Sequence, residues 1–176
     1  MAEPAGFRDF VVARSPALLR TAWMLTGDAG AAEDLLQAAL ARTWPHWHKV
    51  AVGRPEAYVR RVMVRTHASW RSGRWHGELP SEDLADRAGA STDEHSGTEE
   101  RLVLMAALAT LPVRQRQAVV LRYFDDLSVE SVAEIMGSST GTVKSQSAKG
   151  LAKLRQALAD GQPHQSTPNR PVEAKP

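Results

Sequence analysis

Arginine and tryptophan occur together along one stretch of the sequence, and this combination is suited to binding nucleic acid. Residues 54–76 contain six arginines against a single glutamate. Guanidinium groups pair with phosphates, and aromatic rings provide faces on which unstacked bases can lie. A solvated charged helix is the structural alternative. The residues that the pattern singles out are Arg60, Arg61, Arg65, Trp70, Arg71 and Arg74.

A second candidate site lies near the C-terminus, where a short helix, a glycine turn and a longer helix are predicted. Ser128 can cap the short helix, Gly137 marks the turn and Thr140 can cap the long helix. This order is typical of a helix-turn-helix, whose second helix contacts base edges near its N-terminal end. An ordinary helical hairpin is the alternative. The residues expected to face DNA are Lys144, Ser145, Ala148 and Lys149.

The residue types required for catalysis or metal binding do not form a convincing group. The chain has no cysteine, which excludes disulfides, thiolate metal sites and a cysteine nucleophile. His46 and His48 flank Trp47, but no third ligand stands at a suitable spacing. The acidic pair Asp125-Asp126 has no accompanying histidine or serine constellation. We therefore expect a protein that is not an enzyme and that uses no metal or cofactor.

The charges are segregated along the chain. Residues 77–100 hold eight acidic residues against one arginine, directly after the basic stretch. A surface built for a polyanion, next to a segment that repels it, would produce this pattern. Residues 77–98 are also poor in apolar residues and contain glycine and proline, as flexible linkers do. The predicted organisation is a helical domain over 7–76, an acidic linker over 77–98, a second helical domain over 99–160 and a disordered tail over 161–176.

Three helices are predicted in the first domain. Apolar residues from Phe7 to Leu25 recur at helical spacing, and Gly27 with Asp28 ends this helix and caps the next. The second helix covers 29–44 and the third covers 55–75. Trp44 and Trp47 are predicted to be core residues. The expected inner face of the second helix is Ala32, Leu35, Leu36, Ala39, Leu40 and Thr43, and that of the third is Val59, Val62, Met63, Thr66 and Trp70.

The second domain is also predicted to be helical, over 101–111, 113–124, the short helix after Ser128 and 140–159. The expected buried face of the last helix is Val143, Ser147, Leu151, Leu154 and Leu158. No segment alternates like a β-strand. The predicted fold class is therefore all-α, with two small, separately packed helical domains joined by a flexible acidic linker.

Several stretches of this sequence resemble bacterial RNA polymerase sigma factors. Residues 32–40 (AEDLLQAAL) resemble the most recognisable helix of that family. Residues 111–124 (LPVRQRQAVVLRYF), Leu127-Ser128 and residues 141–145 (GTVKS) resemble its promoter-binding C-terminal domain. The lack of a middle domain is typical of the extracytoplasmic-function group, and residues 57–64 (AYVRRVMV) resemble a branch common in high-GC bacteria. The resemblance covers residues 7–76 and 100–158.

The resemblance implies a promoter-specificity subunit of RNA polymerase with three binding surfaces. Asp34, Leu35 and Gln37 would dock on the clamp helices of the β′ subunit, and the C-terminal domain would contact the β flap. The basic third helix and the turn before it would read and melt the −10 element and capture an unstacked non-template base. The last helix would lie in the major groove of the −35 element. The residues implied there are Arg122, Thr142, Lys144, Ser145, Gln146, Ala148 and Lys149.

Some features depart from the family pattern or leave alternatives open. Arg65 stands where relatives usually carry asparagine, and Gln146 and Lys149 stand where arginine is common, so the −35 preference stays open. An anti-sigma factor is a further partner that the resemblance allows. The acidic linker is either a tether or a nucleic-acid mimic. A stand-alone helix-turn-helix regulator would explain only residues 101–158.

The predicted location of the protein is the cytoplasm, without membrane insertion. The N-terminus lacks the pattern of a signal peptide, and no membrane span is expected.

Overall fold

The computed structural model describes residues 4–73 and 95–160, and the regular elements in those ranges are all helical. The predicted linker lies outside the described residues up to residue 94, and residues 95–98 belong to a helix. The predicted tail, Arg74 and Trp75 also lie outside them. None of the described helices is long and apolar enough to cross a bilayer. Their order is α1 (Phe7–Thr26), α2 (Ala29–Thr43), η1 (Trp44–His46), α3 (Trp47–Val50), α4 (Pro55–Gly73), α5 (His95–Ala109), α6 (Val113–Val119), the π-helical segment η3 (Val120–Phe124), α7 (Val129–Met136) and α8 (Thr140–Asp160).

Local signals account for the start and the inner face of α2. Gly27 ends α1 in the left-handed conformation, with φ 83°, and the Asp28 side chain accepts a hydrogen bond of 2.7 Å from the backbone N–H of Ala31. The buried residues of α2 are the predicted stripe, so that prediction is confirmed. In α4, Val59, Met63 and Thr66 are buried as predicted, and Val62 is half-buried. The prediction of Trp70 on the inner face is wrong, because Trp70 is 37% exposed.

An aromatic cluster holds the turn between α2 and α4. The Phe7 ring meets Trp44 and Trp47 edge-on, with ring centroids 4.8 and 5.1 Å apart. The indole N–H of Trp47 donates to the carbonyl of Ala5 at 2.8 Å, which satisfies its polar atom on burial. Trp47 is buried, which confirms its predicted core role, whereas Trp44 is half-buried and packs against the core. These contacts also anchor the segment that leads into α4.

The second unit contains the predicted helix-turn-helix, with one change at the cap of α8. Ser128 accepts from the N–H of Ser131 at the start of α7, and Gly137 ends that helix with φ 60°. The cap of α8 is Ser139, whose hydroxyl accepts from the N–H of Thr142 at 3.1 Å. The prediction of Thr140 as the cap was therefore wrong by one residue, because the helix begins with Thr140 itself.

Helix α8 approaches α6 closely at Gly150. A Cβ atom added to Gly150 would lie 2.7 Å from Cγ2 of Val119 and 3.1 Å from the carbonyl oxygen of Gln115. Gly150 belongs to the buried face, whereas the predicted Leu151 and Leu158 are only half-buried. Small residues allow two helix backbones to approach one another. The periodicity of the large apolar residues in the sequence did not identify Gly150 as part of this contact.

We expect Gly150→Ala to lower the free energy of unfolding by about 1–3 kcal/mol, because the added methyl must displace backbone or Val119. Urea denaturation of the purified chain measures this change. Gly141→Ala is the matched control in the same helix, since its Cβ would meet only the Ser139 hydroxyl at 3.9 Å. Gly141→Ala should leave the free energy of unfolding unchanged or raise it by up to about 1 kcal/mol. Equal stability of both variants would contradict the packing argument.

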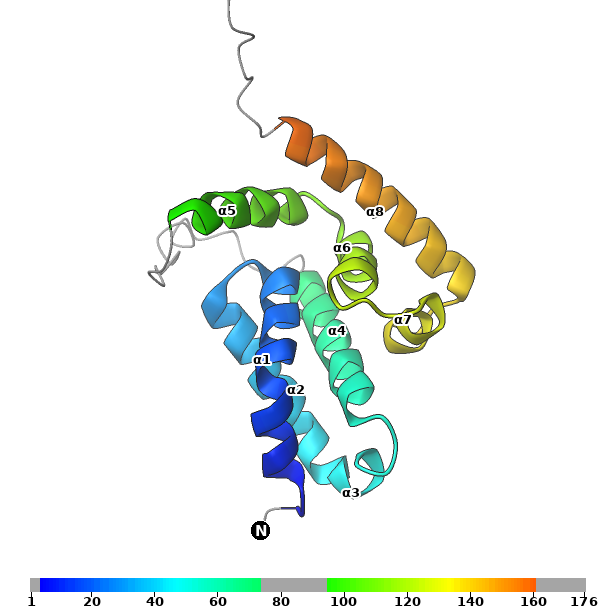
Figure 1. The fold of residues 1–176 in the computed structure, drawn as a ribbon. Coiled ribbons are helices and arrows are strands. Elements are labelled where there is room, and N and C mark those ends of the chain that lie inside the picture. Colours follow the sequence, from blue (N-terminus) through cyan, green and yellow to red (C-terminus); the bar gives the residue numbers. More distant parts are fainter. Residues whose placement is uncertain (1–3, 74–94, 161–176) are drawn as a thin grey trace, which may run out of the picture.

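The two helical units lie against one another, which differs from the predicted separate packing. Helix α4 packs against α6 and α7, and α1 packs against η3 (Figure 1). The buried apolar residues of both units form one cluster. The contact buries polar groups as well: the amide of Gln117 donates to the carbonyl of Val64 at 3.0 Å, and Arg116 Nε donates to the carbonyl of Met24 at 2.7 Å.

Candidate nucleic-acid interface

Helix α2 presents a polar outer face opposite its buried stripe. Asp34 and Gln37 are exposed, and both can contact a partner. Leu35 is fully buried, with no exposed surface. Its predicted role as a docking residue therefore needs correction: it lies in the apolar stripe and supports the helix from inside, so the outer face is formed by its polar neighbours.

The arginines of α4 do not all reach the surface. Arg65 and Arg71 are exposed, as the sequence predicted, and Trp70 of the same helix is exposed as well. Arg61 is half-buried, and its guanidinium lies 3.1 Å from the carboxylate of Glu134 on α7. Cationic and aromatic groups are thus available together along the C-terminal half of α4.

Arg60 is the exception, because its side chain is only 9% exposed. Its Nε lies 2.9 Å from Oδ2 of Asp125, and its Nη1 lies 2.6 Å from Oε1 of Glu56. The assignment of Arg60 to an exposed DNA surface is therefore wrong for this conformation. The physical reason is the second unit, whose Asp125 covers the face of α4 that the first unit alone would leave open.

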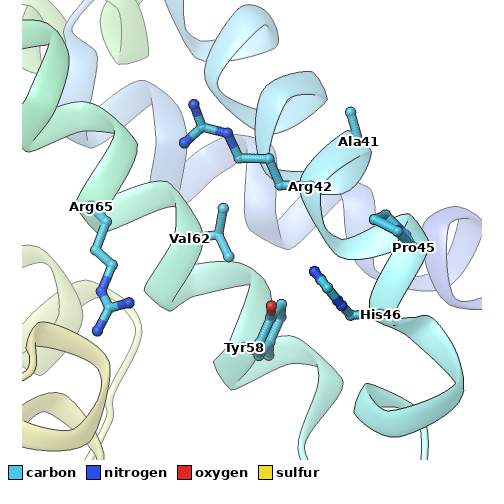
Figure 2. A pocket seen from close by; sticks show the side chains of 7 residues that line it. All are labelled: Ala41, Arg42, Pro45, His46, Tyr58, Val62 and Arg65. Carbon is cyan, nitrogen blue, oxygen red and sulfur yellow. The ribbon is translucent and has the colours of Figure 1, made fainter.

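An open pocket of about 550 Å³ lies between the end of α2 and α4 (Figure 2). The rings of Tyr58 and His46 point toward one another across it. Arg42 is held in place by a hydrogen bond of 2.7 Å from its Nη1 to the Thr66 hydroxyl. Aromatic faces in an open pocket are suited to a nucleobase, while the guanidinium groups of Arg42 and Arg65 point away from the two rings in this structure. The lining residues are Ala41, Arg42, Pro45, His46, Tyr58, Val62 and Arg65.

Sequence reasoning missed Arg42 and Tyr58 and considered His46 only as a metal ligand. The described residues contain no group of three histidine, cysteine, aspartate or glutamate side chains that could hold a metal ion. The available signal was the position of Tyr58 one helical turn before Val62, which places both on one side of α4. The partners from α2 and η1 are brought to that side only by packing.

The outer side of the N-terminal half of α8 is exposed among the described residues. The predicted −35 residues on it are exposed, apart from Gln146, which is half-buried. Val143, Ser147, Gly150 and Leu154 are buried on the opposite side. Arg122 is half-buried, and its guanidinium donates to the carbonyl of Leu127. The exposed residues of this set are Thr142, Lys144, Ser145, Ala148 and Lys149.

Two basic side chains are buried together where α4 meets α6. His67 is 5% exposed and Arg116 is 6% exposed. Burial, together with the positive charges of Arg116 and Arg71, lowers the pKa of His67 to about 4. Burial and Arg71 lower the pKa of Arg116 to about 10. His67 is therefore neutral at pH 7, which avoids a second buried positive charge beside Arg116.

Two family models match the chain, and each covers one of the helical units. Residues 10–76 match sigma-70 region 2, and residues 101–154 match sigma-70 region 4. The chain belongs to the sigma-70 family. The region 2 match contains the outer face of α2, the arginines of α4 and the pocket. The region 4 match contains the helix-turn-helix, as far as Leu154.

The sequences of two relatives align with most of the length of this sigma-70 family member. The RNA polymerase sigma-E factor of Streptomyces antibioticus is 44% identical over 154 residues, which cover 86% of this chain and 84% of the relative. The ECF RNA polymerase sigma factor SigL of Mycobacterium tuberculosis is 32% identical over 165 residues, which cover 90% and 92%. The resemblance inferred from the sequence motifs is confirmed.

Solved structures share the fold of both units. The sigma factor RpoE from Bartonella quintana, solved in complex with the anti-sigma factor NepR, has a TM-score of 0.70 at 22% identity and covers 89% of this chain and 98% of its own. CnrH, solved in complex with the cytosolic domain of CnrY, has a TM-score of 0.61 at 17% identity and covers 89% of each chain. The all-α fold class is confirmed.

Proposed function

We propose that this chain is a promoter-specificity subunit that binds core RNA polymerase, recognises the −10 and −35 promoter elements and starts transcription of a dedicated gene set. The observation that carries the proposal is the presence of region 2 and region 4 on one chain. A stand-alone helix-turn-helix regulator would need only the second unit. That alternative would assign no function to the polar face of α2 or to the pocket beside α4.

Docking on polymerase is assigned to the outer face of α2. Asp34 and Gln37 are exposed on a helix whose opposite side is buried, so they can be changed without disturbing the core. Their expected target is the clamp helices of the β′ subunit, and region 4 is expected to contact the β flap. Charged and polar groups on such a face determine which partner binds and in what orientation.

Recognition of the −10 element is assigned to α4 and the pocket in Figure 2. An unstacked base can enter between Tyr58 and His46, and Arg42 and Arg65 lie within the same lining to attract the phosphates. Arg71 and Trp70 extend this surface toward the end of α4. Duplex reading of the −35 element is assigned to the exposed side of α8.

The proposed activity is binding and not catalysis, since the reaction belongs to the core polymerase. We propose a cytoplasmic site of action, because the polymerase and the promoter are there. An anti-sigma factor is a proposed further partner, since the similar RpoE was solved with one.

The proposal is tested by the combined variant Asp34→Arg and Gln37→Ala. Core polymerase binding should fall at least about tenfold, and run-off transcription should fall with it, because a charged contact is reversed in sign. Binding to −35 duplex DNA and the far-UV circular dichroism should not change. Asp9→Arg, which reverses an exposed carboxylate on α1, is the control and should bind normally. Polymerase binding by the α2 variant equal to that of the unaltered chain would remove the docking assignment.

A further inference from the structure

A buried hydroxyl on α4 holds an arginine of α2 at the edge of the pocket in Figure 2. Arg42 Nη1 donates to the hydroxyl of Thr66 at 2.7 Å. Arg42 is exposed, whereas Thr66 is only 1% exposed. The hydrogen bond therefore joins a solvent-facing cation to an acceptor that lies inside the core.

Thr66 lies on the apolar inner face of α4, where a hydroxyl group needs a partner. It is buried on the same face as Val59 and Met63. Valine has nearly the same shape and buries no polar atom, and a polar group in a core costs free energy unless it is hydrogen-bonded. Arg42 supplies that hydrogen bond. No ion pair and no other hydrogen bond of Arg42 is found in the described part of the chain, so Thr66 is its anchor there.

The anchor fixes the direction of a side chain that would otherwise move between many rotamers. A guanidinium group carries several N–H donors in one rigid plane, so a single hydrogen bond leaves the others free. In Figure 2 the guanidinium of Arg42 points away from the rings of Tyr58 and His46. The free donors therefore lie outside the space between the rings, and they are suited to a phosphate and not to the base.

We propose that Thr66 is a positioning residue for DNA binding, whose hydroxyl orders Arg42 in advance so that the guanidinium meets a phosphate of the strand whose base enters the pocket. This inference rests on the proposed function, because it takes the pocket to be the site of the −10 element. Thr66 itself does not touch DNA, since its side chain is buried. Ordering a side chain in advance removes part of the entropic cost of binding.

Thr66→Val tests the hydroxyl and keeps the shape of the side chain. The released N–H group of Arg42 is on an exposed residue, so water can satisfy it and no buried donor is left unpaired. The probe is fluorescent single-stranded DNA of random sequence, because a phosphate contact does not depend on base identity. The affinity of the full chain for this probe should fall about twofold to tenfold, since Arg42 must then be ordered on binding. An unchanged affinity would overturn the proposal.

Arg42→Ala removes the phosphate contact itself. The affinity for the probe should fall at least as far as in Thr66→Val, and the slope of log affinity against log salt should flatten by about 0.7. Adding Thr66→Val to Arg42→Ala should change the affinity no further, because the hydroxyl acts only through Arg42. A further loss of affinity in the double variant would contradict the positioning role.

Thr43→Val is the matched control, because it makes the same chemical change one residue after Arg42. Thr43 is buried, and its hydroxyl donates to the carbonyl of Ala39 in its own helix at 2.8 Å. This variant should bind the probe as the unaltered chain does.

Thr66→Ser separates positioning from stability. It keeps the hydroxyl and removes a buried methyl group, so its urea midpoint should fall while its affinity for the probe stays close to that of the unaltered chain. If affinity instead followed the urea midpoint across Thr66→Val, Thr66→Ser and Thr43→Val, the hydrogen bond would serve only to tie α2 to α4, and the proposal would be wrong.

The order of Arg42 can be measured without DNA or polymerase. In nitrogen-15 NMR relaxation, the Nε–H group of Arg42 should give a high heteronuclear NOE in the unaltered chain and in Thr66→Ser, and a low one in Thr66→Val. A low value in the unaltered chain would overturn the proposal. The proposed function fails separately, if the unaltered chain supports no run-off transcription with core polymerase, because neither the NOE nor the affinity for the probe involves polymerase.

Discussion

Leu154→Ala is expected to weaken transcription from every promoter alike and to lower the free energy of unfolding by about 2–5 kcal/mol. Leu154 is 5% exposed on the inner side of α8 and belongs to the core cluster. Removing its side chain leaves a cavity beneath α8, so the orientation of the whole helix is loosened. Run-off transcription over a library with a randomised −35 element, together with urea denaturation, measures both effects.

Lys149→Ala is the matched comparison on the outer side of the same helix. Lys149 is exposed, and no contact of its ammonium group is found within the described ranges. If it donates to a base edge, its loss should cost about 1–3 kcal/mol of discrimination at one or two positions of the element, with stability unchanged. A uniform loss over the library would reduce Lys149 to a phosphate contact, and an unchanged stability of Leu154→Ala would contradict the core assignment.

Acid is expected to destabilise the fold through His67, by about 2–3 kcal/mol between pH 7 and pH 4.5. The pKa of His67 is lowered from 6.5 to about 4 by burial, Arg116 and Arg71. The unfolded chain therefore takes up a proton at this side chain as the pH falls below 6.5, while the folded chain stays neutral until about pH 4. The unfolded state binds more protons in this window, so stability falls as the pH falls through it.

The contribution of His67 is separated from that of the carboxylates by comparing variants. Urea denaturation at pH 7 and pH 4.5 should show a smaller difference for His67→Gln than for the unaltered chain, because glutamine does not titrate. His46→Gln should keep the full difference, since His46 is exposed beside the pocket. Equal differences in all three proteins would mean that His67 is not coupled to folding.

Local features of this protein could be predicted from its sequence because they depend on residues close together in the chain. The stripe of α2 follows from helical spacing, and the Asp28 and Ser128 caps follow from the need to satisfy free N–H groups at helix starts. The motifs of regions 2 and 4 also stand in the sequence in recognisable order. The sequence alone therefore determined that the chain is helical, where the helix-turn-helix turn lies and which family the chain resembles.

The tertiary structure decided which polar residues are available to a partner. Arg60 and Arg61 are equivalent in the sequence, yet Arg60 is buried against Asp125, which lies 65 positions further along the chain. Likewise, the pocket gathers Arg42 and Tyr58 from different helices. Helical periodicity identifies the apolar face of an element and contains no information on which distant segment covers its polar face. Long-range packing alone brings those groups within the few ångströms over which hydrogen bonds and ion pairs act.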